Sequence, residues 1–245
     1  MATQVVGRVR WSGERQFYTG LALTMFAAVF LGFARSFFLR PWFPDTPAPT
    51  ERIFYVHGAA FTAWCVLLVV QPALVAIGRT DLHRRIGRLG ALLAVAMVSL
   101  GTVGALTAAR RPTGFIGVPV PPLQFLIVPL FDMALFATFV AVAIAKRRDA
   151  QSHKRLMLLA SVNLLAAGIA RWPFAVMAAG PPAYFGLADL FIVALGTWDL
   201  ASRGRLHAAT LWGGLAIVAS QLLRLVLSGT EGWLAVARWA VGLLG

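Results

Sequence analysis

Residues 54–78 read FYVHGAAFTAWCVLLVVQPALVAIG, and the basic turn RTDLHRRIGR follows at once at 79–88. The first stretch contains no Asp, Glu, Lys or Arg. About 20 consecutive apolar residues cross the hydrocarbon core of a bilayer, and loops on its cytoplasmic side collect Lys and Arg. The stretch therefore predicts a transmembrane helix that ends in the cytoplasm.

The same pattern recurs along the whole chain and predicts about seven spans. They lie near 18–38, 54–78, 86–109, 122–145, 154–178, 182–201 and 207–229. Basic residues gather in every second turn: Arg79, Arg84, Arg85 and Arg88, then Lys146, Arg147, Arg148, Lys154 and Arg155, then Arg203 and Arg205. With those turns in the cytoplasm, the N-terminus lies there too, together with Arg8, Arg10 and Arg15. We expect an all-α polytopic transmembrane bundle that forms one integral membrane domain over residues 1–245.

The turns on the opposite side differ in kind. Residues 39–52 and 111–122 are rich in proline, which suits stiff loops at the interface. The tail from Glu231 is too short to cross the bilayer again. Its Trp233, Arg238 and Trp239 favour an interfacial helix over 232–245.

Composition agrees with a membrane protein. The 245 residues are 59% hydrophobic and 13% charged, and the mean hydropathy is +0.77. The net charge of +13 lies mostly in membrane-flanking turns, so anionic lipid headgroups at the cytoplasmic turns are the expected partners, and nucleic acid is not. The single Cys65 excludes a disulfide framework, and no P-loop or dinucleotide-binding fingerprint is present.

Four ionisable residues fall inside the predicted spans, in the half away from the basic turns: Asp132, Asp189, Arg171 and Arg224. A charge in hydrocarbon costs about 3 kcal/mol or more without a partner, so mutual pairing is expected, with Arg171 or Arg224 as the partner of Asp132. Such pairs either hold helices together or line a polar path.

A second set of polar residues lies along the span at 54–78. At 100° per residue, His57, Trp64 and Gln71 form one stripe, which should face protein. His57 is then either a hydrogen-bonded core histidine or a ligand of haem or a metal.

The other histidines, His83, His153 and His207, each stand at the cytoplasmic start of a span. A helix N-terminus and neighbouring arginines favour the neutral ring that a metal needs. The acids nearby, Asp81, Asp149 and Asp199, are either helix caps or carboxylates that orient the rings. Three histidines inside and one outside allow at most one bis-histidine haem. A tris-histidine metal site at His83, His153 and His207 and a phosphate or headgroup site at the same helix starts are the alternatives.

Two stretches carry a resemblance. The run from Trp64 to Gly90, with its His-Arg-Arg-x-Gly-Arg turn at 83–88, resembles a family of uncharacterised bacterial multi-span membrane proteins. So does the Asp-x-x-x-His-Lys-Arg-Leu-Met-Leu signature at 149–158. The resemblance implies a bacterial cytoplasmic (inner) membrane but no activity. The start of the span at 154–178 is also similar to small membrane proteins of haem-copper oxidase assembly, which implies haem or metal.

Three functions follow as hypotheses. The first is a redox or assembly protein that binds haem b or a divalent metal through His57, His83, His153 and His207. The second is a lipid-binding or transport protein with an intramembrane path of Asp132, Asp189, Arg171, Arg224 and Gln71. The third is a membrane-embedded enzyme that modifies a lipid.

Overall fold

The computed structural model describes residues 13–49 and 51–243, so Arg8, Arg10 and the last two residues of the expected helix 232–245 lie outside the described residues. Every regular element in that part of the chain is helical. The helices are α1 (Gly13–Phe33), α2 (Arg52–Ala76), α3 (Thr80–Arg110), α4 (Pro122–Phe125), α5 (Ile127–Ala145), α6 (Ala150–Ile169), α7 (Pro181–Arg203), α8 (Ala208–Leu227) and α9 (Glu231–Gly242). A π-helical turn, Ala34–Phe38, continues α1, and short 3₁₀ turns occupy Arg40–Trp42 and Ala175–Ala179.

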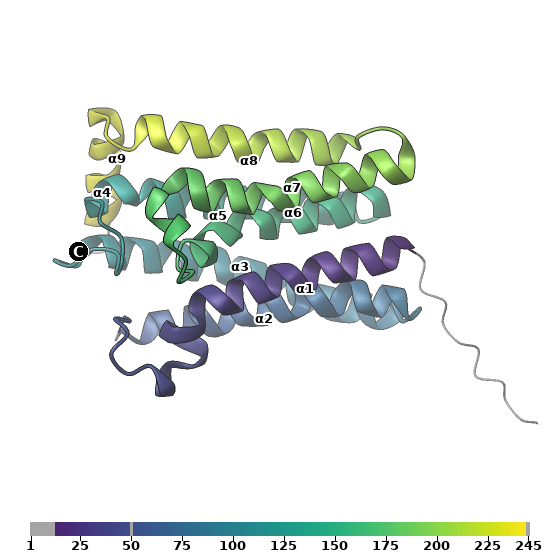
Figure 1. Cartoon of the computed structure of the whole chain (residues 1–245), viewed down its shortest axis with the longest axis horizontal. Coiled ribbons are helices and arrows are strands. Elements are labelled where there is room, and N and C mark those ends of the chain that lie inside the picture. Colours follow the sequence, from purple (N-terminus) through teal and green to yellow (C-terminus); the bar gives the residue numbers. More distant parts are fainter. Residues whose placement is uncertain (1–12, 50, 244–245) are drawn as a thin grey trace, which may run out of the picture.

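The long helices run side by side along the long axis of the molecule (Figure 1). Six of the described stretches are long and apolar enough to cross a membrane: Gly13–Phe38, Arg52–Ala76, Thr80–Arg110, Pro122–Ala145, Pro181–Arg203 and Ala208–Leu227. The protein is therefore a multi-pass membrane protein. The stretches match the expected spans to within a few residues.

The helix α6 is the one long helix of the bundle that is not among these six. It packs against α1, α5, α7 and α8, and Leu159 and Ile169 on it are fully buried. Because protein surrounds it, α6 can carry polar residues that a lipid-facing helix cannot. The span expected to continue to residue 178 ends at Ile169, because Pro173 disfavours helical backbone in the residue before it.

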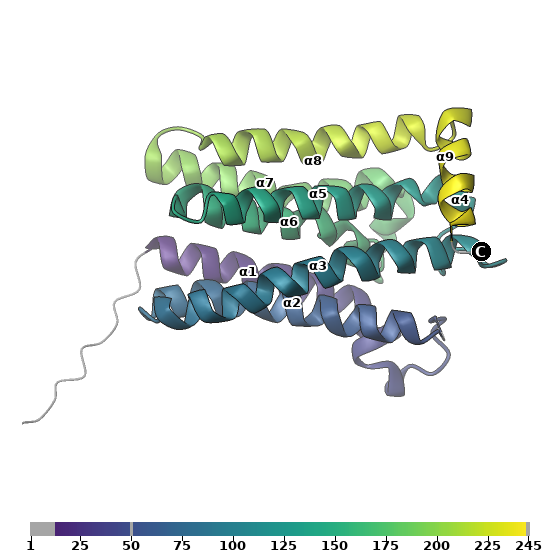
Figure 2. The same ribbon diagram turned by 180° about the vertical axis from the view of Figure 1, so that it is seen from behind.

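The two ends of the bundle differ in charge. The starts of α1, α3, α6 and α8 and the ends of α2, α5 and α7 lie together at one end, which we call the basic end. Its exposed cations among the described residues are Arg15, Arg79, Arg84, Arg85, Arg88, Lys146, Arg147, Arg148, Arg203 and Arg205. At the other end, which we call the distal end, α9 lies across the bundle (Figure 2). Trp233 at its start donates a hydrogen bond from Nε1 to the carbonyl of Leu123, at 2.8 Å.

Helices α1 and α6 approach each other most closely at two glycines. A Cβ on Gly32 would lie 2.0 Å from the carbonyl oxygen of Gly168. Small residues allow helix backbones to approach closely in membrane proteins. Gly32 therefore sets the crossing of α1 over the central helix.

We expect Gly32→Ala to destabilise the protein by about 1–3 kcal/mol, because the two backbones must separate to admit the methyl group. Gly20→Ala on the same helix is the control, since a Cβ there meets nothing within 4 Å. Thermal unfolding in detergent should show a lower midpoint for Gly32→Ala alone. Equal midpoints for both variants would mean that α1 is not held at this crossing.

Candidate functional site

A buried ion pair joins helices α5 and α8 in the distal half of the bundle. The Nη1 of Arg224 donates to Oδ1 of Asp132 at 2.7 Å, and the two side chains are 2% and 9% exposed. Asn163 on α6 accepts from Nη2 of Arg224 at 3.3 Å and donates from Nδ2 to the backbone carbonyl of Asp132 at 2.9 Å. Ser220 accepts from the same Nη2 at 3.0 Å. Of the two arginines expected as partners of Asp132, Arg224 is the one that pairs with it. The cluster ties three helices together.

This cluster is not fully satisfied. The Nε of Arg224 is buried and has no hydrogen-bond partner among the described residues. An unpaired polar group in a low-dielectric interior is costly, and a cluster that served only to hold helices together would gain by pairing it. The guanidinium thus keeps a donor for a second acceptor.

A second acid lies beside this cluster on α7. Oδ1 of Asp189 accepts from Nε2 of Gln221 at 2.9 Å. Gln221 and Arg224 are three residues apart on α8 and so share one face of that helix. Within residues 13–49 and 51–243, Asp189 forms no ion pair. The Gln221 amide, one turn from Arg224 on α8, thus holds the carboxyl group of Asp189.

Arg171 does not join the cluster. It follows the end of α6, where its Nη1 donates to the carbonyl of Ala167 and its guanidinium lies 4.8 Å from the centroid of the Phe33 ring. The expected mutual pairing of two acids with two bases is therefore wrong in this respect. Because α6 ends at Ile169, Arg171 stands in the turn at the distal end and not within a span.

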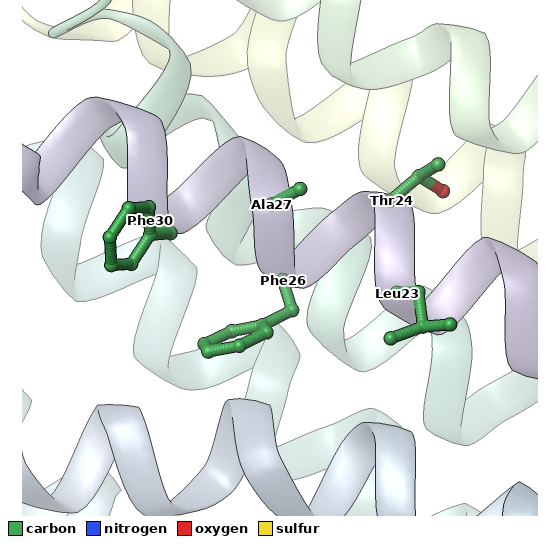
Figure 3. Close-up of a pocket in the computed structure, with 5 residues that line it drawn as sticks. All are labelled: Leu23, Thr24, Phe26, Ala27 and Phe30. Carbon is green, nitrogen blue, oxygen red and sulfur yellow. The ribbon is translucent and has the colours of Figure 1, made fainter.

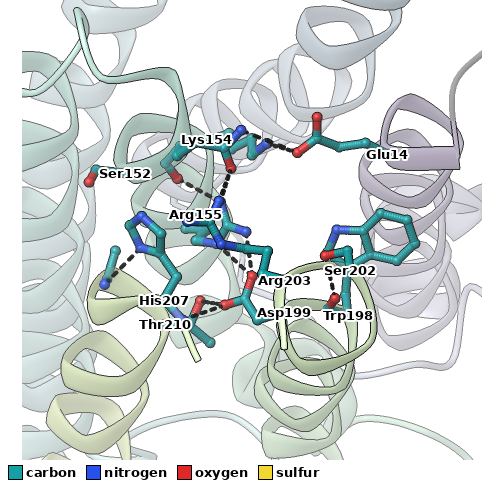
Figure 4. A network of polar contacts seen from close by, with 12 residues as sticks. Glu14, Ser152, Lys154, Arg155, Trp198, Asp199, Ser202, Arg203, His207 and Thr210 are labelled. Atoms are coloured by element: carbon teal, nitrogen blue, oxygen red, sulfur yellow. Dashed lines mark hydrogen bonds and ion pairs between the residues drawn. The ribbon is translucent and has the colours of Figure 1, made fainter. Parts of the chain in front are cut away.

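A second buried ion pair, at the basic end, was not predicted. Arg155 on α6 and Asp199 on α7 are both fully buried, and Nε of Arg155 donates to Oδ1 of Asp199 at 2.9 Å (Figure 4). The other oxygen of Asp199 accepts from the hydroxyl of Thr210 at 2.6 Å and from the backbone N–H of His207 at 3.1 Å. Nη1 of Arg155 also donates to Oε1 of Gln151 at 2.6 Å. The pair is well satisfied and joins α6, α7 and the start of α8.

Further ionic contacts extend from this pair to α1 (Figure 4). Lys154 forms an ion pair with Glu14, and its ammonium group lies 4.6 Å from the centroid of the Tyr18 ring. Gln151 donates to the same carboxylate of Glu14 at 3.4 Å. These contacts fix the start of α1 against α6.

The acids that precede α6 and follow α2 act locally. Asp149 is the N-cap of α6 and accepts from the backbone N–H groups of Gln151 and Ser152. Its bond from the Ser152 hydroxyl, together with those backbone bonds, lowers the pKa of the Asp149 carboxyl. Asp81 pairs with Arg79 at 3.3 Å on the exposed surface. The capping interpretation is therefore confirmed for Asp149.

His207 caps α8 with its ring. Nδ1 accepts from the backbone N–H of Ala209 at 3.1 Å. Desolvation lowers the pKa of the His207 ring, and the positive charges of Arg155 and Arg203 lower it further. The ring is therefore held neutral, as expected, but its neutral nitrogen serves a helix terminus.

His83 and His153 lie close together, with their ring centroids 6.4 Å apart. Nδ1 of His153 donates to the carbonyl of Ala143 at 2.8 Å, which leaves its Nε2 unprotonated in the neutral ring. The amide of Gln71 is best placed with its oxygen toward the Gly87 N–H at 3.1 Å and its nitrogen toward Nδ1 of His83 at 2.6 Å. Nδ1 of His83 then accepts, so its Nε2 carries the proton.

The expected stripe on α2 does face protein. Trp64 is 5% exposed and donates from Nε1 to the Ser161 hydroxyl at 3.0 Å. The ring of His57 stacks on Phe61 with centroids 4.0 Å apart and lies near Gly104 of α3. His57 is thus in the α2–α3 contact, far along the bundle from the other three histidines.

The tris-histidine arrangement does not form. In the part of the chain that the structure describes, no three His, Cys, Asp or Glu side chains are grouped so as to hold a metal ion. The physical reason lies in the local contacts, because the ring of His207 turns to the start of its own helix and only His83 and His153 approach each other.

Asp199 is the residue that sequence reasoning should have placed in a site. It lies within the expected span 182–201, so the rule that singled out Asp189 applies to it equally. Arg155 gave no separate signal, because it stands in a run of basic residues that topology alone explains.

Comparison of the chain with protein families, with curated proteins and with solved structures finds no match. The resemblance to a bacterial multi-span family stays a prediction.

Proposed function

We propose that the protein carries protons across the membrane through the cluster formed by Asp132, Arg224 and Asp189. The observation that supports this most strongly is Asp189. It is a carboxyl group within a membrane-spanning helix, and its bonded neighbour is the Gln221 amide. Gln221 stands one turn before Arg224 on α8, and the Nε of Arg224 has no hydrogen-bond partner among the described residues. Ionisable groups inside membrane bundles characteristically mark proton and ion pathways.

The proposed step is an exchange of partners. Arg224 can neutralise one carboxylate at a time, and in the arrangement described here it is bonded to Asp132. The carboxyl of Asp189 is then stable in the protonated form, because a second carboxylate in this interior lacks a cation. When Arg224 turns to Asp189, the proton leaves Asp189 and Asp132 takes one up. Each exchange moves a proton from one acid to the other.

The proposed proton path includes a second buried polar group at the basic end, the Arg155–Asp199 ion pair. Asp199 and Asp189 are ten residues apart on α7, which corresponds to about 15 Å along the helix. Between the depths of Asp189 and Asp199 lie apolar side chains that are fully or almost fully buried: Leu159, Leu195 and Ile217. We infer that this apolar layer is the barrier that a change in the packing of α7 and α8 must open.

We further infer that the basic end faces the cytoplasm, which places the N-terminus inside. The exposed arginines of the α2–α3, α5–α6 and α7–α8 turns all lie at this end. Cysteine labelling from outside the cell should modify a cysteine at Pro119 in the α3–α4 loop and spare one at Arg148. The reverse labelling would invert the topology.

The test of the transport proposal uses purified protein in potassium-loaded liposomes that contain a pH-sensitive dye. Valinomycin sets the membrane potential, and the rate of internal acidification or alkalinisation is measured. Wild-type protein should move protons faster than empty liposomes. Asp189→Asn should lower that rate to the empty-liposome level, because the amide keeps the hydrogen bond to Gln221 but carries no exchangeable acid proton.

Asp81→Asn is the matched control for the loss of a carboxylate. Asp81 is exposed at the basic end and pairs only with Arg79 among the described residues, so this variant should retain the wild-type rate. A wild-type rate for Asp189→Asn, or no flux from the wild-type protein in either direction, would rule the proposal out.

A haem- or metal-dependent redox role is the second candidate, and the proximity of His83 and His153 favours it. Both rings tie Nδ1 to a neighbour, and Nε2 of His153 offers a lone pair, whereas Nε2 of His83 carries the proton. Ligation by both requires the Gln71 amide to turn over, so that Nδ1 of His83 becomes the donor. The optical spectrum and metal content of freshly purified protein test this candidate.

If a haem or metal binds there, His83→Ala and His153→Ala should each remove the absorption band or the metal, while His57→Ala and His207→Ala should not. Equal retention in all four variants would exclude the histidine pair as the ligand set.

A further inference from the structure

We propose that the groove between α1 and α7 binds the acyl chain of a membrane lipid whose anionic headgroup pairs with Arg171. This site is separate from the proton cluster and does not depend on it. It combines an apolar surface with an exposed cation at one end. An anionic phospholipid complements both features, because it has an apolar acyl chain and a negatively charged headgroup.

The groove is built on one face of α1. A hollow of about 520 Å³ lies over Leu23, Thr24, Phe26, Ala27 and Phe30. Figure 3 shows Thr24 and Ala27 on one side of the helix and Leu23 and Phe26 on the other, with Phe30 farther along the helix. The Thr24 hydroxyl is turned back to the carbonyls of Gly20 and Leu21 and offers no polar group to the hollow.

A second hollow of about 330 Å³ continues the first toward α7. It shares Thr24 and Ala27 with the first hollow and adds Ala28, Leu31, Trp172 and Phe191. Both hollows fall within the size range of small-ligand sites, about 300–1,000 Å³. From Leu23 to Leu31 the groove extends about 12 Å along α1, at 1.5 Å per residue.

The ends of the groove are defined by aromatic contacts. Toward the basic end, Phe17 of α1 stacks on Trp198 of α7 with centroids 4.4 Å apart, and this contact closes the space between the two helices. Toward the distal end, Trp172 donates from Nε1 to the carbonyl of Ala28 at 2.9 Å. Trp172 thus lies at the distal end of the groove, and we place the exit of the acyl chain beside it.

Arg171 stands at that exit. It is adjacent to Trp172 in the chain, is exposed, and lies over Phe33, two residues beyond Leu31. Its Nη1 donates to the carbonyl of Ala167, and within residues 13–49 and 51–243 it forms no ion pair with a carboxylate. The position of this charge favours an anionic lipid, because such a lipid brings a net negative charge to the guanidinium, whereas the phosphate of a zwitterionic lipid is offset by the lipid's own cationic group.

The experiment is native mass spectrometry of the purified protein titrated with phosphatidylglycerol and, separately, with phosphatidylcholine. Wild-type protein should hold its first phosphatidylglycerol more tightly. Arg171→Gln should weaken that first binding about fivefold, the effect expected for one basic residue, and leave phosphatidylcholine unchanged. Arg171→Lys should keep the preference. Arg52→Gln, which removes another exposed cation at the distal end, should have no effect.

Filling the groove tests the acyl-chain part. Ala27→Trp should weaken the first binding of both lipids, whereas Ala141→Trp on the exposed surface of α5 should not. Equal affinity of the two lipids for wild-type protein, or an unchanged first affinity in Arg171→Gln, overturns the proposal. If Ala27→Trp instead changes the oligomeric state, α1 is an interface between protein copies and the lipid assignment is wrong.

Discussion

Arg224→Ala is expected to destabilise the protein by about 3–5 kcal/mol and to reduce its folded yield sharply. The reason is that the change leaves the Asp132 carboxylate buried without a cation, and the cost of breaking a buried pair far exceeds the value of the pair itself. The side-chain oxygen of Asn163 also loses a donor. Chemical denaturation in mixed micelles, or the monodisperse fraction on size-exclusion chromatography, measures the effect.

The control removes both charges at once. Asp132→Leu combined with Arg224→Met should be close to wild type in stability, because replacing both members of a buried pair with apolar residues of similar size is often neutral. A double variant as unstable as Arg224→Ala would show that the cluster contributes stability by something other than charge pairing.

The second large effect is expected at the basic end. Arg155→Met should cost about 3–5 kcal/mol, because Asp199 is fully buried and would keep only the bonds from Thr210 and His207. Arg84→Met removes an exposed cation from the same end and should change stability by less than about 0.5 kcal/mol. Thermal unfolding of the two variants in one detergent compares them directly. Similar midpoints would mean that the buried pair contributes little to the α6–α7 contact.

The sequence was sufficient to predict most of the fold. The spacing of apolar runs and basic turns located the membrane-crossing helices to within a few residues, because hydrocarbon thickness and loop charge act on each span separately. The early end of α6 was the main error in the spans, although Pro173 was a visible signal. That error placed Arg171 inside a helix and made it a false candidate partner of Asp132.

The candidate site was predictable only in part. Depth along a helix narrowed the partner of Asp132 to two arginines, but depth does not fix which helices are neighbours. The same uncertainty about neighbouring helices applies to His83, His153 and His207. They stand at equivalent positions at helix starts, but they can share a ligand only if those helices are in contact. The Arg155–Asp199 pair could not be predicted for a different reason. Membrane topology already explains a run of basic residues near a helix start, and the sequence does not show which of those residues points into the bundle.

Proton flux of the charge-neutral double variant shows whether the exchange of Arg224 between two carboxylates carries protons. Asp132→Leu with Arg224→Met retains Asp189 and the fold but removes the exchange of partners, so it separates transport from stability. Liposomes with the folded double variant should acidify or alkalinise no faster than empty liposomes under an imposed potential, while wild-type protein does so rapidly. A double variant that moves protons at the wild-type rate would show that the buried Asp132–Arg224 pair only holds the helices together.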